Sequence, residues 1–134
     1  MANELDDVKV GALGVKVPFT VTVDSSIAKA AEKMLRERVH SLIVIDKAGK
    51  VAGMISAWDI LKTTFMAEKT KEMPVSKLIE GQVIVYIYTE MPLRDALNLM
   101  IDKNIRAMPV LDEGDKLVGK ISLTDIAKFV REKL

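Results

Sequence analysis

The fold of this chain is constrained most strongly by an internal duplication. Residues 44–60 reappear in recognisable form as residues 110–126, at a constant shift of 66 positions (125 − 59 = 66). The correspondence runs without a gap from Ala30 and Ala96 to Lys62 and Lys128. A match of this length means that a whole structural unit was duplicated, rather than a short motif. We therefore expect a pseudo-symmetric molecule with a cleft between its two halves.

The length of the chain indicates that the two halves share one core. Each half of a 134-residue chain is hardly long enough to bury the apolar surface that independent folding needs. Apolar residues make up 49% of the sequence and aromatic residues only 4%, which suits a core of aliphatic side chains. No apolar run approaches the roughly 20 residues that span a bilayer. We expect a globular protein without a membrane-spanning segment.

Composition also excludes several kinds of function. The absence of cysteine excludes disulfides, thiolate metal sites and thiol catalysis, and His40 as the only histidine excludes multi-histidine metal chemistry. The 20 basic and 19 acidic residues are interspersed and sum to a net charge of +1, which speaks against nucleic-acid binding. Residues 1–9 are acidic and lack the apolar stretch of a signal peptide, so we expect a cytoplasmic protein.

The hydrophobic pattern predicts the order β-α-β-β-α in each copy. Strands are predicted at residues 20–23, 42–45, 51–55, 84–88, 108–111 and 117–121. Apolar residues at helical spacing predict a helix after the first strand of each copy, through Ile27, Ala30, Met34 and Leu35 and through Leu93, Ala96, Met100 and Ile101. A second helix follows Ser56 or Ser122. We expect an α+β fold in which the two repeats pack with pseudo-two-fold symmetry in a three-layer arrangement of sheets and helices.

The boundary between the repeats is expected near Met73-Pro74, because proline ends a helix and begins a link. Residues 1–72 would hold an N-terminal lead-in and the first repeat, and residues 73–134 would hold the second. Residues 1–19 and 75–84 are predicted to be the extended lead-ins of the two repeats.

Each copy carries Ser-x-x-Asp at the start of its last helix, as Ser56 with Asp59 and Ser122 with Asp125. The pattern is typical of a capping box, in which the serine accepts from an early helix N–H and the acidic residue reaches back to the cap. The same geometry also fits a ligand site, because a helix N-terminus favours an anion and a nearby carboxylate accepts hydrogen bonds from vicinal hydroxyls, as on a ribose. The local pattern alone favours the capping box.

The wider context resembles the paired cystathionine-β-synthase (CBS) domains known as Bateman modules. The resemblance covers nearly the whole chain, from Val10 onward. It rests on the β-α-β-β-α order and on four segments: Val-His-Ser-Leu-Ile-Val-Ile-Asp at 39–46, Gly-Met-Ile-Ser-Ala-Trp-Asp at 53–59, Arg-Ala-Met-Pro-Val-Leu-Asp at 106–112 and Gly-Lys-Ile-Ser-Leu-Thr-Asp at 119–125. No single segment is decisive, but two copies in register and in order are specific.

The resemblance implies a sensor of adenine nucleotides with up to two sites in the cleft between the repeats. The implied ribose-binding residues are Asp59, Asp125, Ser56 and Ser122. The adenine slots would be lined by Phe19, Val39 and Met54 in one site and by Val85, Ile105 and Lys120 in the other. The phosphates would meet His40 in the first repeat and Arg106 in the second, and Lys120 either reaches a phosphate or marks one site as degenerate.

The chain departs from the family pattern on the phosphate side. Many nucleotide-binding members carry a basic residue just before the aspartate, where this chain has Trp58 and Thr124, and Ser41 and Ala107 fill a position that is basic in some relatives. Fewer fixed cations favour AMP or ADP over ATP. S-adenosylmethionine and NAD(H) stay open as alternative adenosyl ligands.

No arrangement of residues supplies a nucleophile, a base and an orienting third group, so we expect a regulatory module rather than an enzyme, with neither cofactor nor metal. The alternative is a ligand-free dimerisation or adaptor unit whose serines and aspartates are only caps. Under both hypotheses the apolar faces of the two final helices, with Phe65 and Phe129, predict a homodimer. An unidentified regulated protein is a further expected partner.

Overall fold

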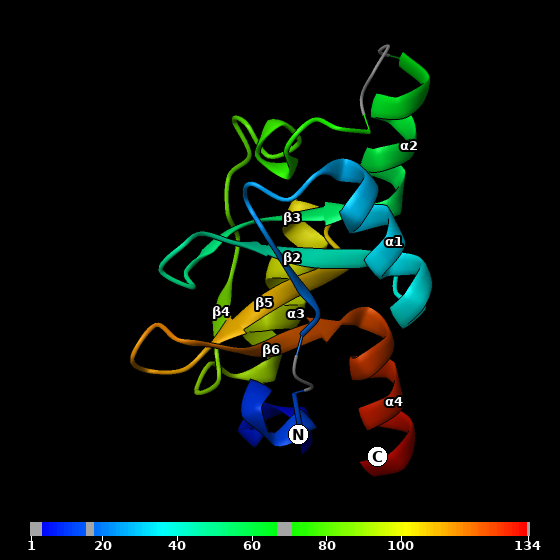
Figure 1. The fold of residues 1–134 in the computed structure, drawn as a ribbon. Coiled ribbons are helices and arrows are strands. Elements are labelled where there is room, and N and C mark those ends of the chain that lie inside the picture. Colours follow the sequence, from blue (N-terminus) through cyan, green and yellow to red (C-terminus); the bar gives the residue numbers. More distant parts are fainter. Residues whose placement is uncertain (1–3, 16–17, 67–70, 134) are drawn as a thin grey trace. The chain divides into compact units, whose positions relative to one another are not determined.

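The computed structural model describes residues 4–15, 18–66 and 71–133, and in them the predicted β-α-β-β-α order occurs twice (Figure 1). The first copy consists of β1 (Thr20–Thr22), α1 (Ile27–Glu37), β2 (Ser41–Ile45), β3 (Val51–Ser56) and α2 (Ala57–Met66). The second consists of β4 (Ile87–Tyr88), α3 (Leu93–Lys103), β5 (Ala107–Leu111), β6 (Leu117–Ser122) and α4 (Leu123–Lys133). Two sheets and four helices confirm the predicted α+β class. No helix in the described ranges is long and apolar enough to cross a membrane.

The two sheets have the same topology. In the order β1-β2-β3, the first pair is parallel and the second antiparallel, and β4-β5-β6 repeats this arrangement. Each hairpin turn is organised by one aspartate: Oδ1 of Asp46 accepts from the N–H groups of Ala48 and Lys50, both at 2.9 Å. Asp112 binds its own turn in the same way. The Asp and Gly residues between the apolar runs therefore form the turns that the sequence predicts.

The hydrophobic cores of the two copies match residue by residue. One buried cluster contains Val21, Ile27, Ala30, Met34, Leu42, Val44, Ile55, Ile60 and Val75. The other contains Ile87, Leu93, Ala96, Met100, Met108, Val110, Ile121, Ile126 and Val10. Eight of the nine pairs are separated by the 66 positions of the sequence repeat, and Val10 and Val75 are separated by 65 (75 − 10 = 65). The duplication therefore conserves a packing arrangement as well as a sequence.

The lead-ins differ from the extended segments that the sequence predicts. Their described parts contain 3₁₀ turns at Glu4–Asp7, Val10–Leu13 and Val75–Lys77, while residues 1–3, 16 and 17 of the first lead-in lie outside the described residues. The turns form because Val10 and Val75, both fully buried, anchor each segment to a core. The predicted strand at 84–88 is likewise shorter, since β5 pairs only with Ile87 and Tyr88.

Each lead-in packs against the repeat other than the one that it was predicted to introduce. The N–H of Val10 donates to the carbonyl of Met91, and the N–H of Val75 donates to that of Ser25, the equivalent position. The compact units are accordingly Pro18–Ile84, called here the first repeat unit, and Met1–Val17 with Val85–Leu134, the second repeat unit. This division differs from the predicted boundary after residue 72, because hydrogen bonds and apolar burial assign a lead-in more strongly than sequence adjacency does.

Two of the expected core positions on the helices are exposed. Leu35 on α1 is 81% exposed and its counterpart Ile101 on α3 is 67% exposed. Both follow the methionine that closes the buried stripe, Met34 or Met100, so the buried face of each helix is narrower than the sequence pattern indicates.

Candidate functional site

The two Ser-x-x-Asp elements form capping boxes of nearly identical geometry. Oδ2 of Asp59 accepts from the N–H of Ser56 at 2.8 Å and from its hydroxyl at 2.9 Å, and the N–H of Asp59 donates to Oγ of Ser56 at 3.1 Å. In the second unit the corresponding distances between Ser122 and Asp125 are 2.9, 2.9 and 3.1 Å. One carboxylate oxygen of each aspartate, Oδ2, is thus committed to the helix start. A capping role leaves each aspartate one oxygen for a ligand.

The other carboxylate oxygen distinguishes the two copies. Oδ1 of Asp59 lies 4.0 Å from the ammonium of Lys62, one helical turn later on α2. The position equivalent to Lys62 is Lys128 on α4, and Lys128 lines a cavity together with Asp125. A lysine three positions after the aspartate is therefore present in both units. In the first unit its ammonium lies near the aspartate carboxylate, and in the second the lysine lines a cavity.

His40 and Arg106 lie beside these helix starts through their backbones. The carbonyl of His40 accepts from the N–H of Ala57 at 2.8 Å, and that of Arg106 accepts from the N–H of Leu123 at 2.9 Å. The first residue of each final helix is thereby tied to the residue that precedes β2 or β5. Both side chains are exposed.

A cavity of about 190 Å³ lies within the second repeat unit, beside Asp125. Its lining includes Lys120 from β6, and Asp125, Lys128 and Glu132 from α4. Burial lowers the pKa of the Lys120 ammonium below its ordinary value of 10.5, and the charge of Asp125 opposes this shift only in part. The cavity thus combines the carboxylates of Asp125 and Glu132 with the ammonium groups of Lys120 and Lys128, along α4 and beside β6.

Lys120 and Asp125 are predicted site residues, whereas the remainder of the lining of this cavity was not predicted. Leu13, Gly14 and Val15 of the lead-in and Phe129 of α4 also contribute. Lys128 and Glu132 fall three and seven positions after Asp125, and this helical spacing places the three residues on one face of the helix. The sequence spacing alone could therefore have predicted that Lys128 and Glu132 lie beside Asp125. The lead-in residues gave no local signal, because they come from the other end of the chain. Phe129 packs against the core here, which leaves it less available to a partner than predicted.

The predicted adenine residues occupy two kinds of environment. Val39 packs against the core of the first unit, and Val85 and Ile105 pack against that of the second. Phe19 is 40% exposed. Its carbonyl accepts from the N–H of Ile43, the residue opposite Met54 in the sheet, so Phe19 and Met54 flank the same position of β2.

A larger, open hollow of about 410 Å³ lies between β1 and α1. It is lined by Thr20, Val21, Thr22, Ser25, Lys29, Glu32, Lys33 and Arg36, and it includes none of the predicted site residues. Lys33 already donates to the carbonyl of Thr20 across it. Among the predicted site residues, Lys120 and Asp125 line the smaller cavity instead.

The duplicated β-α-β-β-α unit with a capped final helix matches a known sequence profile, that of the CBS domain, over residues 10–64 and again over residues 75–132. The chain belongs to the CBS domain family. Its two matches cover most of the sequence, so it is a CBS domain pair, as the resemblance of its motifs predicts.

Similar sequences occur in proteins of different size. An uncharacterized 17.7 kDa protein of Acidianus ambivalens is 29% identical over 120 residues, which is 90% of this chain and 71% of that protein. The L-aspartate semialdehyde sulfurtransferase of Methanocaldococcus jannaschii is 28% identical over 114 residues. This chain spans only 21% of that enzyme and 61% of an uncharacterized protein of Methanopyrus kandleri. CBS pairs of this kind therefore occur within longer proteins.

Solved structures share the fold at lower identity. The CBS domain pair of protein MJ0100, in complex with 5′-methylthioadenosine and S-adenosyl-L-methionine, superposes with a TM-score of 0.81 at 24% identity and covers 95% of this chain and 98% of that one. CBSX2 in complex with AMP gives a TM-score of 0.76 at 24% identity, over 92% of this chain and 96% of that one. At this identity the likeness establishes the fold of the CBS pair.

Proposed function

We propose that this CBS pair is a regulatory module that binds an adenine nucleotide, with AMP or ADP favoured over ATP, and that binding changes its conformation or its partner contacts. The observation that carries the proposal is the cavity beside Asp125, where the carboxylates of Asp125 and Glu132 and the ammonium groups of Lys120 and Lys128 line one space. Two proteins with the same fold support the proposal: CBSX2 is in complex with AMP, and the MJ0100 domain pair is in complex with 5′-methylthioadenosine and S-adenosyl-L-methionine.

The residues have complementary roles in this proposal. Oδ1 of Asp125 accepts hydrogen bonds from the ribose hydroxyls while Oδ2 holds the cap. Lys120, Lys128 and the exposed side chain of Arg106 meet the phosphate. Glu132 also lines the cavity, and its carboxylate repels further negative charge. Each added phosphate therefore contributes less binding free energy, which disfavours ATP.

The cavity is smaller than the roughly 300 Å³ at which drug-sized pockets begin, so it holds the ribose and phosphate rather than the whole nucleotide. The base then lies against Val85 and Ile105, the residues predicted to line the adenine slot of this unit. No catalytic role is included in the proposal, because binding and release of the nucleotide suffice for regulation.

A ligand panel tests this function directly. Thermal-shift and calorimetric titrations with AMP, ADP, ATP, NADH and S-adenosylmethionine should show binding in the micromolar range for AMP or ADP. A ligand at one hundred times its dissociation constant adds about 2.7 kcal/mol to stability, which raises the melting temperature measurably. Preferred binding of S-adenosylmethionine or NADH would reassign the ligand. Absence of binding by every compound below millimolar concentration would favour the alternative, a ligand-free dimerisation or adaptor module.

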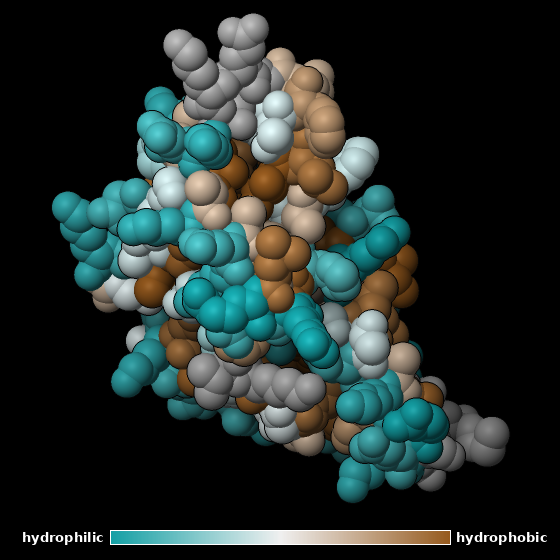
Figure 2. Space-filling view, turned by 45° about the vertical axis from the view of Figure 1, so that its right-hand side comes forward, coloured by the Kyte–Doolittle hydropathy of each residue, from teal (hydrophilic) through white to brown (hydrophobic). Residues whose placement is uncertain are grey.

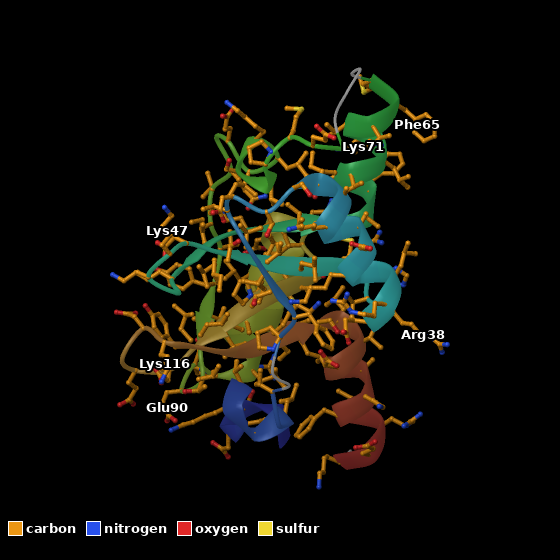
Figure 3. All side chains as sticks on the ribbon, in the orientation of Figure 1. Arg38, Lys47, Phe65, Lys71, Glu90 and Lys116 are labelled. Carbon is orange, nitrogen blue, oxygen red and sulfur yellow. The ribbon has the colours of Figure 1, made fainter. Side chains whose placement is uncertain are left out.

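The proposed partner of the module is a second copy of the chain. On the first repeat unit Leu35, Trp58, Leu61, Phe65 and Met66 are all substantially exposed, and Phe65 is 84% exposed. Figure 2 shows apolar atoms at the surface near the end of α2, and Figure 3 shows Phe65 projecting from that helix. Apolar surface of this extent is typical of an interface. Light scattering should give a dimer for the wild type and a monomer for Phe65→Glu; a wild-type monomer at micromolar concentration would contradict the dimer.

A further inference from the structure

Three basic side chains line the open hollow between β1 and α1. Lys29, Lys33 and Arg36 follow one another along one face of α1 at helical spacing, and all three border this space of about 410 Å³. Glu32 also lines the hollow, so three cations and one carboxylate leave a net charge of +2 among the described lining residues. The hollow lies within the first repeat unit, and Asp125 belongs to the second.

The strand side of the hollow is the outer edge of β1, which is an edge strand of its sheet. The carbonyl of Thr20 accepts from Nζ of Lys33, and the carbonyl of Thr22 accepts from the N–H of Ser25 at 3.1 Å. An added peptide strand would need these carbonyls, so the edge is closed to strand pairing. The ammonium of Lys33 keeps further N–H donors for an anion in the hollow.

The second copy carries the opposite charge at the same helical positions. At the shift of 66 residues, the counterparts of the three cations on α3 are Asp95 for Lys29, Leu99 for Lys33 and Asp102 for Arg36. Both aspartates are exposed. A helix of the same fold therefore forms without these cations, so the duplicated fold does not require them in the first copy.

The lining favours a polar anion that carries no nucleobase. Val21 is the one apolar side chain among the described lining residues, and none of them is aromatic, so they offer no ring on which a base could stack. From Lys29 to Arg36 the cations extend along roughly 10 Å of helix, at 1.5 Å per residue. Two linked phosphate groups match this extent and the net charge of +2 better than a single phosphate does.

We propose that this hollow is a second ligand site, which binds a small anion with two linked phosphate groups, either free diphosphate or a diphosphate ester. Lys29 and Lys33 meet the phosphates as point charges, and the guanidinium of Arg36 binds one of them through two N–H groups. Arg36 now pairs with Glu37 at 3.3 Å, and an exposed ion pair of this kind costs little to exchange. The plain alternative is a solvated helix face on which Lys33 only protects an edge strand.

Calorimetric titration with inorganic pyrophosphate tests the site. The wild type should bind one pyrophosphate per chain, more weakly as salt is added, because Lys29 and Arg36 are exposed. Lys29→Asp combined with Arg36→Asp introduces the residues of the second copy and should weaken binding at least about tenfold. The matched control, Lys47→Asp combined with Lys50→Asp in the exposed β2–β3 turn, changes the net charge equally and should alter affinity less than about twofold.

Two further measurements sharpen the test. Lys29→Gln combined with Arg36→Gln removes both charges with residues that favour a helix, and it should weaken binding less than the aspartate pair does. Melting curves should show every variant folded, because the changed side chains are exposed. Ethyl diphosphate distinguishes the two sources of the ligand: tighter binding than that of pyrophosphate would identify an ester.

The outcomes separate this site from the proposed nucleotide site, on which it does not depend. Failure of pyrophosphate to bind the wild type, or equal losses in the two charge-reversed pairs, would overturn it. Loss of pyrophosphate binding in Asp125→Ala would overturn it too, because the anion would then belong to the second repeat unit. Binding of single-stranded RNA without binding of pyrophosphate would also overturn it. Failure of AMP alone to bind would contradict only the proposed function.

Discussion

At the scale of single residues, the two copies differ most where Met54 on β3 is replaced by Lys120 on β6. Both residues occupy the same register position, opposite Ile43 and Pro109. A methionine there can be buried without electrostatic cost, whereas the ammonium of Lys120 is partly desolvated and its pKa is lowered. A charged side chain at a partly buried position, despite the cost of desolvation, is typical of a residue that binds a ligand.

Lys120→Met should therefore increase stability and weaken the ligand. A lysine whose folded-state pKa lies below its unfolded value destabilises the fold while it is charged, and this penalty fades as pH rises toward 10.5. We expect a gain of up to about 1 kcal/mol in the free energy of unfolding at pH 7, a smaller gain at pH 10, and a lower affinity for AMP. Urea unfolding at both pH values measures the gain.

The matched control is Lys116→Met, in the exposed β5–β6 turn labelled in Figure 3. It should change neither stability nor its pH dependence appreciably. An equal gain in both variants would show that burial of Lys120 is not its cause.

Tyr88 provides a second test at this scale. Its hydroxyl donates to Oδ1 of Asp115 at 2.7 Å, and this hydrogen bond raises the pKa of Tyr88 to about 12. The bond favours the protonated phenol, so its contribution to stability is present below about pH 10, the unfolded value, and is lost as pH rises through about 12. Asp115→Gly suits the positive φ of 62° at this position and should return the titration toward pH 10. Phenolate absorbance follows it, and an unchanged titration would contradict the assigned bond.

At the scale of elements, local chemistry predicts the hairpins and helix starts but not the lead-ins. Asp46 and Asp112 bind their own turns, and each Ser-x-x-Asp caps its own helix, so all the partners lie within a few residues. The lead-in partners lie some 80 residues away for Val10 and 50 for Val75 (91 − 10 = 81; 75 − 25 = 50). The lead-in residues of the cavity, Leu13 to Val15, were missed for the same reason, whereas Lys120 and Asp125 lie in motifs.

The lead-ins should contribute strongly to stability. Val10→Ala and Val75→Ala each remove two buried methyl groups from a core and should each cost about 2 kcal/mol in the free energy of unfolding. Val83→Ala, at a position 82% exposed, should cost less than about 0.5 kcal/mol. Chemical denaturation of the three variants measures these values. A cost for Val10→Ala as small as that of Val83→Ala would show that the N-terminal segment is not part of the second core.

At the scale of the whole molecule, the two copies share their core positions and differ at the predicted site residues. The nine buried positions correspond one to one. Beyond the cores, Met54 of the first copy corresponds to Lys120 of the second, and His40 corresponds to Arg106. The sequence predicts this asymmetry through single residues, but the contact between Gln82 and Met54 depends on a turn 28 positions away and emerges only from the structure.

The central claim is that an adenine nucleotide binds beside Asp125, and calorimetry of AMP with Asp125→Ala and Asp59→Ala tests it most directly. Both variants lose an equivalent capping box, so both should lose about 1 kcal/mol of stability. We predict that Asp125→Ala lowers AMP affinity at least about tenfold, as loss of a hydrogen-bonding carboxylate should, while Asp59→Ala leaves it unchanged. Equal AMP affinity in Asp125→Ala and the wild type would contradict the claim and leave the aspartates as caps alone.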